Sequence, residues 1–236
     1  MPNYPAILQY PITRSVTFQT RVVIHEDTTE QRWPLVVGSE SLALNHSNLT
    51  LAERDLLIAC FEDATGDHDQ TVDVLLGAEA LNGYHFEGGE LSFTERKPGR
   101  WETQVTLRKV ARAADLGALA ADFPVLASGA RVQLPYTHGR GFDNVIVRTE
   151  GGRYEHARRA TSLRTWSAGG PCLSSADALA IWNHFSRARG RWKAFGFTDA
   201  DSGVRYASCR FASDTLEWRY VGPGHHAVEV KIQQIV

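Results

Sequence analysis

Apolar residues recur at helical spacing in two stretches of the chain, residues 50–66 and 174–190. The first stripe consists of Leu57, Phe61 and Ala64, and the second of Ile181, Phe185 and Ala188. Spacings of three and four residues place such side chains on one face of a helix. Each stretch begins with Thr or Ser three residues before an acidic residue and ends with glycine, as helices commonly do. The pattern predicts two amphipathic helices, and each needs a sheet to cover.

Segments of alternating or β-branched character lie on both sides of each helix and predict strands. The turns Pro98-Gly99 and Pro223-Gly224 separate two pairs of such segments and predict β-hairpins. The expected strands are residues 16–25, 33–37, 71–76, 90–96 and 101–110 around the first helix, and residues 143–148, 154–166, 192–198, 215–221 and 225–235 around the second. One helix and several short antiparallel strands in each half predict an α+β fold class, mainly antiparallel β.

The helix and strands of one half match those of the other position by position. At an offset of 124 residues, Leu49 corresponds to Leu173 and Phe61 to Phe185. With one residue added in the following loop, the matches are Phe86 with Phe211, Leu91 with Leu216, Phe93 with Trp218, and Val105 with Val230. Coincidence of apolar spacing is the alternative, but a single gap brings a helix and a hairpin into register together. We therefore predict two copies of one domain.

The repeat divides the 236 residues into a first domain at 1–110 and a second at 133–236. Both lengths are ordinary for a domain. Residues 111–132 connect them, and this Ala-rich segment is compatible with a short helix around Leu119 and Phe123. Because it lacks the composition of a Gly/Ser linker, we expect it to pack rather than flex.

Composition excludes several classes of protein. The net charge of −2 argues against a general nucleic-acid or membrane-surface binder. Cys60, Cys172 and Cys209 have no Cys-x-x-Cys spacing, which favours neither a disulfide framework nor a zinc site. No stretch approaches the ~20 apolar residues of a membrane span. The sequence does not open like a signal peptide, so we expect a cytoplasmic protein.

The sequence contains only weak signals for a metal-binding or catalytic site. Residues 199–203 resemble the start of a calcium loop, but Arg210 stands where that loop needs its glutamate, which favours a polar turn. His225 and His226 are adjacent strand residues that point to opposite faces, so they cannot chelate one ion together, and at a hairpin tip we expect them to be solvated. His184 is expected to pack in the core. Motifs of nucleophilic hydrolases and phosphate loops are absent, so we predict no enzyme, no cofactor and no metal.

Two groups of residues are candidates for contacts between subunits. Three prolines in residues 1–15 predict an extended arm carrying Tyr4 and Tyr10, which either packs on its own domain or reaches a neighbouring subunit. Arg158 and Arg164 lie on one face of the strand expected at 154–166, because residues an even number apart share a face. That face is either solvated or contacts acidic neighbours.

The second copy carries a recognisable series of features. Its helix ends at Gly190, an aromatic-Lys-x-Phe segment follows at residues 192–195, and a hairpin closes the chain at 215–235. A Gly-x-Tyr turn, ending at Tyr154, precedes the long strand. These features resemble the minor tail proteins of long, non-contractile-tailed phages (siphophages) and the related distal tail proteins. The resemblance covers residues 140–236 directly and residues 20–110 through the repeat, where His68-Asp69-Gln70 replaces the Arg-Trp-Lys segment.

The resemblance implies a structural virion protein with two tandem tail-tube-like domains, each a β-sandwich or barrel with one flanking helix. Such proteins form a ring at the distal end of the tail tube, which joins the tube to the baseplate hub or tail tip and lines the DNA channel. The implied partners are further copies of the chain, the tail tube protein, the hub protein and the tape measure protein, with DNA only as passing cargo and no membrane. The implied location is the virion tail, assembled in the host cytoplasm.

The number of chains in such a ring stays open between two counts. Three two-domain chains would give a pseudo-sixfold ring, and six would give two stacked tiers. We favour three, because diverged copies suit alternating positions in one closed ring.

Two functions of other classes are alternatives. A carbohydrate-binding module at the tail tip would need several of the six tryptophans on one exposed face. A small hydrolase on a β-sandwich would need a polar triad, which the sequence does not offer.

Overall fold

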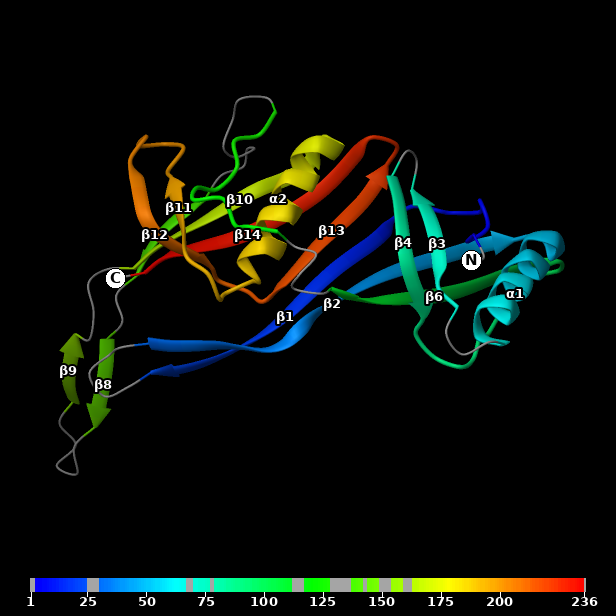
Figure 1. Ribbon diagram of the computed structural model, residues 1–236, viewed down its shortest axis with the longest axis horizontal. Helices are drawn as coiled ribbons and strands as arrows, with labels where there is room; N and C mark the ends of the chain where they lie inside the picture. Colours follow the sequence, from blue (N-terminus) through cyan, green and yellow to red (C-terminus); the bar gives the residue numbers. More distant parts are fainter. Residues whose placement is uncertain are drawn as a thin grey trace.

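The computed structural model describes residues 3–24, 30–66, 70–76, 79–111, 117–127, 137–141, 144–148, 154–158 and 163–235. The first half of the chain contains β1 (Ile12–Ile24), β2 (Glu30–Leu49), α1 (Leu51–Gly66), β3 (Val72–Leu76), β4 (Glu79–Phe86), β5 (Thr94–Lys97) and β6 (Arg100–Ala111). The second contains β7 (His138–Gly141), β8 (Asn144–Arg148), β9 (Tyr154–Arg158), β10 (Leu163–Leu173), α2 (Ser175–Ala188), β11 (Phe195–Thr198), β12 (Arg205–Phe211), β13 (Thr215–Gly222) and β14 (His225–Gln234). Figure 1 shows an elongated molecule with α1 at one end, the β8–β9 hairpin at the other and α2 between them. The expected class, α+β with mainly antiparallel sheet, is confirmed.

The long hairpin of β1 and β2 forms the framework of the first half. Its ladder runs from Thr13 opposite Ala43 to Ile24 opposite Glu30. Inward positions such as Val16 and Leu42 are buried, whereas outward positions carry small polar residues. Since strand side chains alternate between faces, this pattern gives the hairpin one core face and one solvent face.

Both helices begin with the caps that the sequence predicts. At α1, the Glu53 N–H donates to Thr50 Oγ1 at 3.3 Å, and the Thr50 N–H donates to the Glu53 carboxylate at 2.7 Å. At α2, the Asp177 N–H donates to Ser174 Oγ at 3.2 Å. These bonds satisfy N–H groups that the first helical turn leaves without partners. α1 then packs on β4 and β6, and α2 on β10, β13 and β14.

The two halves pair their strands in the same pattern. In the first half, β6 pairs with β2, β4 and β5, and β4 pairs with β3. In the second half, β14 pairs with β10, β12 and β13, and β12 pairs with β11. Residues that lie opposite each other in the first half have counterparts that lie opposite each other in the second. Leu44 opposite Val105 corresponds to Ala168 opposite Val230, Phe86 opposite Leu107 to Phe211 opposite Ile232, and Thr20 opposite Pro34 to Asn144 opposite Arg158. The register shift between His46 and Leu49 recurs between Gly170 and Leu173.

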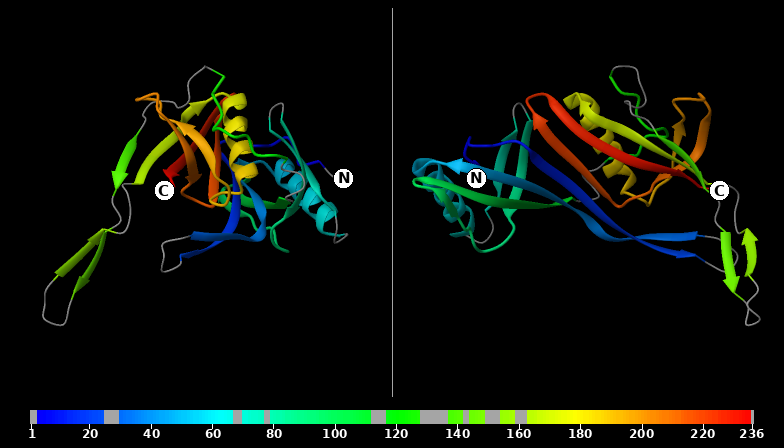
Figure 2. Two further views of the ribbon diagram at one scale, coloured as in Figure 1. Left: turned by 60° about the vertical axis from the view of Figure 1, so that its left-hand side comes forward. Right: turned by 180° about the vertical axis from the view of Figure 1, so that it is seen from behind.

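One sheet joins the halves, in the order β11-β12-β14-β13-β1-β2-β6-β4-β3. At its centre, β13 pairs antiparallel with β1, from Ile12 opposite Tyr220 to Thr17 opposite Thr215. A strand of the second half therefore extends the sheet of the first (Figure 2). The buried apolar residues form one connected core beneath both helices.

The segment between the halves differs from the expectation. Residues 117–127 contain no helix. The Phe123 N–H donates to Gly196 O at 2.8 Å beside β11, just as the Tyr4 N–H donates to Asp73 O at 2.9 Å beside β3. Pro124 removes a helical donor, and the ring of Phe123 fills the core, so this part of the segment repeats the N-terminal arm.

Several strand boundaries also differ. The strand expected at 90–96 begins only at Thr94, as β5, and the strand expected at 33–37 is part of the longer β2. Trp192 lies in a turn, and β11 begins only at Phe195. The single strand expected at 154–166 is described as β9 and β10, with residues 159–162 outside the described residues.

Candidate assembly surfaces

The solvent face of the central sheet is a continuous polar surface that crosses from one half to the other. We call it the polar face. Because directly opposed residues share a face, the ladders define its rows. They are Ala227, Arg219, Thr13, Ala43 and Thr106 across five strands, Glu217, Ser15, Ser41 and Arg108 across four, and Thr215, Thr17, Ser39 and Val110 across four. None of these residues is buried.

Hydroxyl groups and charges of both signs make up most of the polar face. Ser15 and Ser41 share a hydrogen bond of 2.8 Å across β1 and β2. Thr17 and Thr215 share one of 3.2 Å across the junction of the halves. Since a row holds Glu217 as well as Arg108, the face offers hydrogen bonds without a large field of one sign. Such a surface contacts a passing polyanion without the strong binding that a cationic surface produces.

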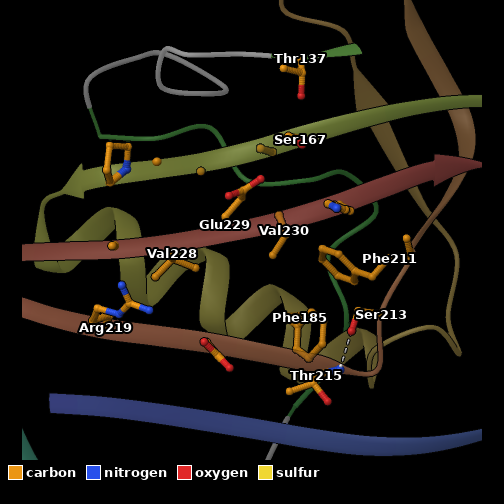
Figure 3. A pocket seen from close by; sticks show the side chains of 18 residues that line it. Thr137, Ser167, Phe185, Phe211, Ser213, Thr215, Arg219, Val228, Glu229 and Val230 are labelled. Atoms are coloured by element: carbon orange, nitrogen blue, oxygen red, sulfur yellow. Dashed lines mark hydrogen bonds between the residues drawn. The ribbon is translucent and has the colours of Figure 1, made fainter. Parts of the chain in front are cut away.

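A hollow of about 960 Å³ opens where β13 and β14 diverge (Figure 3). Its floor includes Phe185 and Phe211, and its rim includes Ser167, Thr215 and Glu229. Residues 215–220 of β13 pair with β1, but only residues 218–222 pair with β14, so β13 and β14 separate at residues 215–217. The hollow therefore lies beside the junction of the halves.

A polar cluster lies beneath the junction, on the core side of the sheet, and all of its members are buried except Glu79, which is partly exposed. We call it the junction cluster: Arg14, Glu40, Glu79, Tyr84 and Tyr220. The Arg14 guanidinium donates to Glu40 at 2.5 Å and to Glu79 at 2.9 Å. Tyr84 donates to Glu40, and Tyr220 donates to Glu79 at 3.0 Å. Because Tyr220 belongs to the second half and the other four to the first, the cluster ties the halves together.

The surroundings of Arg14 keep it charged. Its guanidinium lies 4.5 Å from the ring centre of Trp182 and 5.5 Å from that of Trp218. Burial by itself lowers the pKa of Arg14, but the Glu40 carboxylate raises it, and the net shift is upward. Burial also raises the pKa of Tyr84 and Tyr220, so both phenols stay protonated donors. The cluster is thus an ion pair with its hydrogen-bonding groups satisfied, which is the condition for tolerating buried charge.

The two tyrosines of the N-terminal arm have different environments. Tyr4 is buried, and its hydroxyl bonds His46 Nε2 at 2.7 Å, so at this point the arm packs on its own half. Tyr10 is 42% exposed. Contact of Tyr10 with a neighbouring subunit stays a prediction.

The two arginines proposed as an interface lie in different strands. Arg158 is the last residue of β9 and Arg164 lies in β10, and residues 159–162 between them are outside the described residues. That the two arginines share a face therefore stays a prediction. The Arg164 guanidinium donates to the Tyr206 hydroxyl and lies 5.0 Å from its ring centre. Arg164 is therefore held in place at the outer end of the second-half sheet.

The prediction that both hairpin-tip histidines are solvated is wrong for one of them. His226 is buried, where it accepts from the Trp218 indole at 3.0 Å and bonds Ser175 at 2.7 Å. The reason is register: His226 lies opposite Leu173 on the core side, whereas His225 is exposed. His184 packs in the core among Phe123, Phe195 and Phe211, as expected.

The Asp199 turn is closed by its own hydrogen bonds. The Asp199 carboxylate accepts from the Asp201 N–H at 3.1 Å and from the Ser202 hydroxyl at 2.8 Å. Within the described residues, no three His, Cys, Asp or Glu side chains converge as ligands for a metal ion. Nor is any helix in that part of the chain long and apolar enough to cross a membrane.

Sequence reasoning did not find the junction cluster. The sequence contains one signal for the cluster. Arg14 and Glu40 are charged, but in their alternating strands they stand at inward positions between apolar neighbours. A charged residue at a core position is expected only with a partner, and a pair of opposite charges on adjacent strands satisfies that condition.

A comparison with protein-family models finds no match, and no curated protein sequence matches this chain.

Proposed function

We propose that this chain is a structural subunit of a long-tailed phage or phage-like particle, built from two tandem tail-tube-like domains. In this proposal it forms a ring at the distal end of the tail tube, connects the tube to the baseplate hub or tail tip, and lines the DNA channel. The partners proposed with it are the tail tube, hub and tape measure proteins.

One observation carries the proposal: the two halves share strand order, pairing and register, and the rows of the polar face run unbroken across their junction. Repeated units joined edge to edge through a sheet give a head-to-tail contact, which can close into a ring when repeated. In such a ring the polar face is suited to the channel, because its few charges are of both signs and leave little net attraction for DNA phosphates.

The carbohydrate-binding alternative has less support. Trp166, Trp182 and Trp218 are buried and cannot stack on a sugar. Trp33 is exposed, whereas the partly buried Trp101 and Trp192 lie against the guanidinium groups of Arg54 and Arg189. A row of open stacking platforms therefore has no support.

The purified chain tests the proposal by light scattering with negative-stain electron microscopy. We expect particles of three times the chain mass with a central opening, and particles of six times that mass would support the two-tiered ring instead. A chain that stays monomeric at every concentration up to the solubility limit would contradict ring formation. Quenching of tryptophan fluorescence by glycans would then favour the carbohydrate-binding alternative.

A further inference from the structure

The junction between β1 and β13 is a contact between two units that have the same internal ladders. The units correspond residue by residue, so each of the two paired strands has a counterpart in the other half. An identical contact between two chains would use these two counterparts. β1 of the first half corresponds to β7 of the second, because Arg14 lies opposite Leu42 and His138 lies opposite Trp166. β13 of the second half corresponds to residues 90–97 of the first, because Tyr220 lies opposite His226 and Glu95 lies opposite Trp101.

In the described part of the chain, no strand pairs with the outer edge of β7 or with the outer edge of residues 90–97. β7 pairs with β10 on one side only. Residues 90–93 belong to no strand, although their counterparts 215–218 are a regular strand wherever β1 lies beside them. The physical difference is the missing neighbour, because a β-strand needs a ladder partner to satisfy its backbone groups.

The side chains of the two edges are suited to each other. Leu91 and Phe93 are only partly buried, whereas their counterparts Leu216 and Trp218 are fully buried beside β1. Glu90 and Glu95 lie along one edge and Arg140 lies in the other, so the two edges carry opposite charge. Pairing would bury the apolar residues, and the opposite charges would attract the edges only at longer range, because Arg140 comes to lie opposite Leu91.

We propose that residues 90–94 of one chain pair antiparallel with residues 137–141 of a neighbouring copy, in the register of the β1–β13 junction. The pairs are then Thr94 opposite Thr137, Phe93 opposite His138, Ser92 opposite Gly139, Leu91 opposite Arg140, and Glu90 opposite Gly141. The inference rests on the proposed ring and names its contact between chains. Each junction within a chain then alternates with one between chains, and the sheet continues from chain to chain around the ring.

Cysteine crosslinking of the full chain tests this register. In a Cys172→Ser background, which removes the exposed native thiol, the pair Thr94→Cys and Thr137→Cys places two near-isosteric thiols on exposed residues. Directly opposed residues in an antiparallel pair have Cα atoms about 4.5–5.5 Å apart, within the reach of a disulfide. Mild oxidation is expected to produce interchain dimers and trimers on a non-reducing gel, with most of the chain shifted and full reversal by a reductant.

Two further variants in the same background are the controls. Thr13→Cys with Arg219→Cys is the equivalent pair inside one chain, and it should form an intrachain disulfide. Glu90→Cys with Thr137→Cys is offset by four residues, about 13 Å along a strand, and should not crosslink.

The outcomes distinguish this contact from the ring itself. Rings without crosslinking of the 94/137 pair, while the internal pair oxidises, would overturn the proposed pairing and leave the ring standing. Equal crosslinking of the matched and offset pairs would overturn the register. A monomer that crosslinks with neither pair would overturn both proposals.

Discussion

Residue 184 and its counterpart 60 differ in chemistry although they occupy corresponding core positions of the two halves. Both side chains are buried on the core side of their helices, but one is histidine and the other cysteine. Burial raises the pKa of the Cys60 thiol to about 11, so it stays protonated. Burial, helped by the charge of Arg187, lowers the pKa of His184 to about 4 although Asp122 opposes the shift, so His184 is neutral at pH 7. Each half thus fills the same position with an uncharged group.

The substitution His184→Cys gives this position the residue of the other half, and we expect it to reduce the acid sensitivity of folding. The unfolded chain protonates His184 near pH 6.5 and the folded chain only near pH 4, so its contribution is complete above pH 6.5 and is lost as pH falls toward 4. Between pH 7 and pH 5 this loss is about 2 kcal/mol. Urea unfolding at both pH values measures it. His46 and His226 titrate in both proteins, so an equal loss in the two would contradict the assignment.

At the scale of elements, residues 117–127 form an arm that packs on the second half. Phe123 packs against Phe195, Phe197 and Phe211, and its N–H extends the edge of β11. The N-terminal arm is placed in the same way by Tyr4 and β3. An extended segment with one aromatic anchor therefore completes each half.

We expect Phe123→Ala to destabilise the chain by about 3–5 kcal/mol, because truncation leaves a large cavity among aromatic rings. Val125 lies in the same segment but is 56% exposed, so Val125→Ala should change stability by less than about 0.5 kcal/mol. Thermal or urea unfolding of both variants gives the comparison. If the two losses were alike, the segment would act as a connection rather than as an arm.

At the scale of the whole molecule, the junction cluster and the β1–β13 ladder make one body of two similar halves. Asp214 strengthens this contact, since its backbone oxygen accepts from the Phe18 N–H at 2.8 Å and its carboxylate accepts from the Thr20 hydroxyl at 2.9 Å. The ring of Phe18 then contacts Phe185 of α2. The halves are held by backbone pairing, buried charge and apolar packing together.

Arg14→Met should cost about 3–5 kcal/mol, because the substitution leaves the buried Glu40 carboxylate without its cation. Adding Glu40→Gln removes that charge, so the double variant should recover part of the loss. Denaturant unfolding of the wild type, both single variants and the double variant forms a double-mutant cycle. Strict additivity of the two losses would show that the pair is not coupled.

The sequence by itself determined the helices, their caps, the closing hairpins and the matched positions of the two halves. Each of these depends on local spacing: helical stripes, alternation in strands, and Pro-Gly turns. Phe86 with Phe211 and Val105 with Val230 do occupy equivalent positions in their ladders. The expected helix near Phe123 was wrong because contact with β11 overrides the local preference of an alanine-rich segment.

Only the tertiary structure decided how the halves meet. Arg14, Glu79 and Tyr220 are far apart in the sequence and come together because β13 pairs with β1. No local pattern encodes which strand edge accepts which other edge, since every edge offers the same backbone donors and acceptors. The choice depends on the summed burial, charge pairing and register of side chains across the whole contact, and these exist only when the chain is folded.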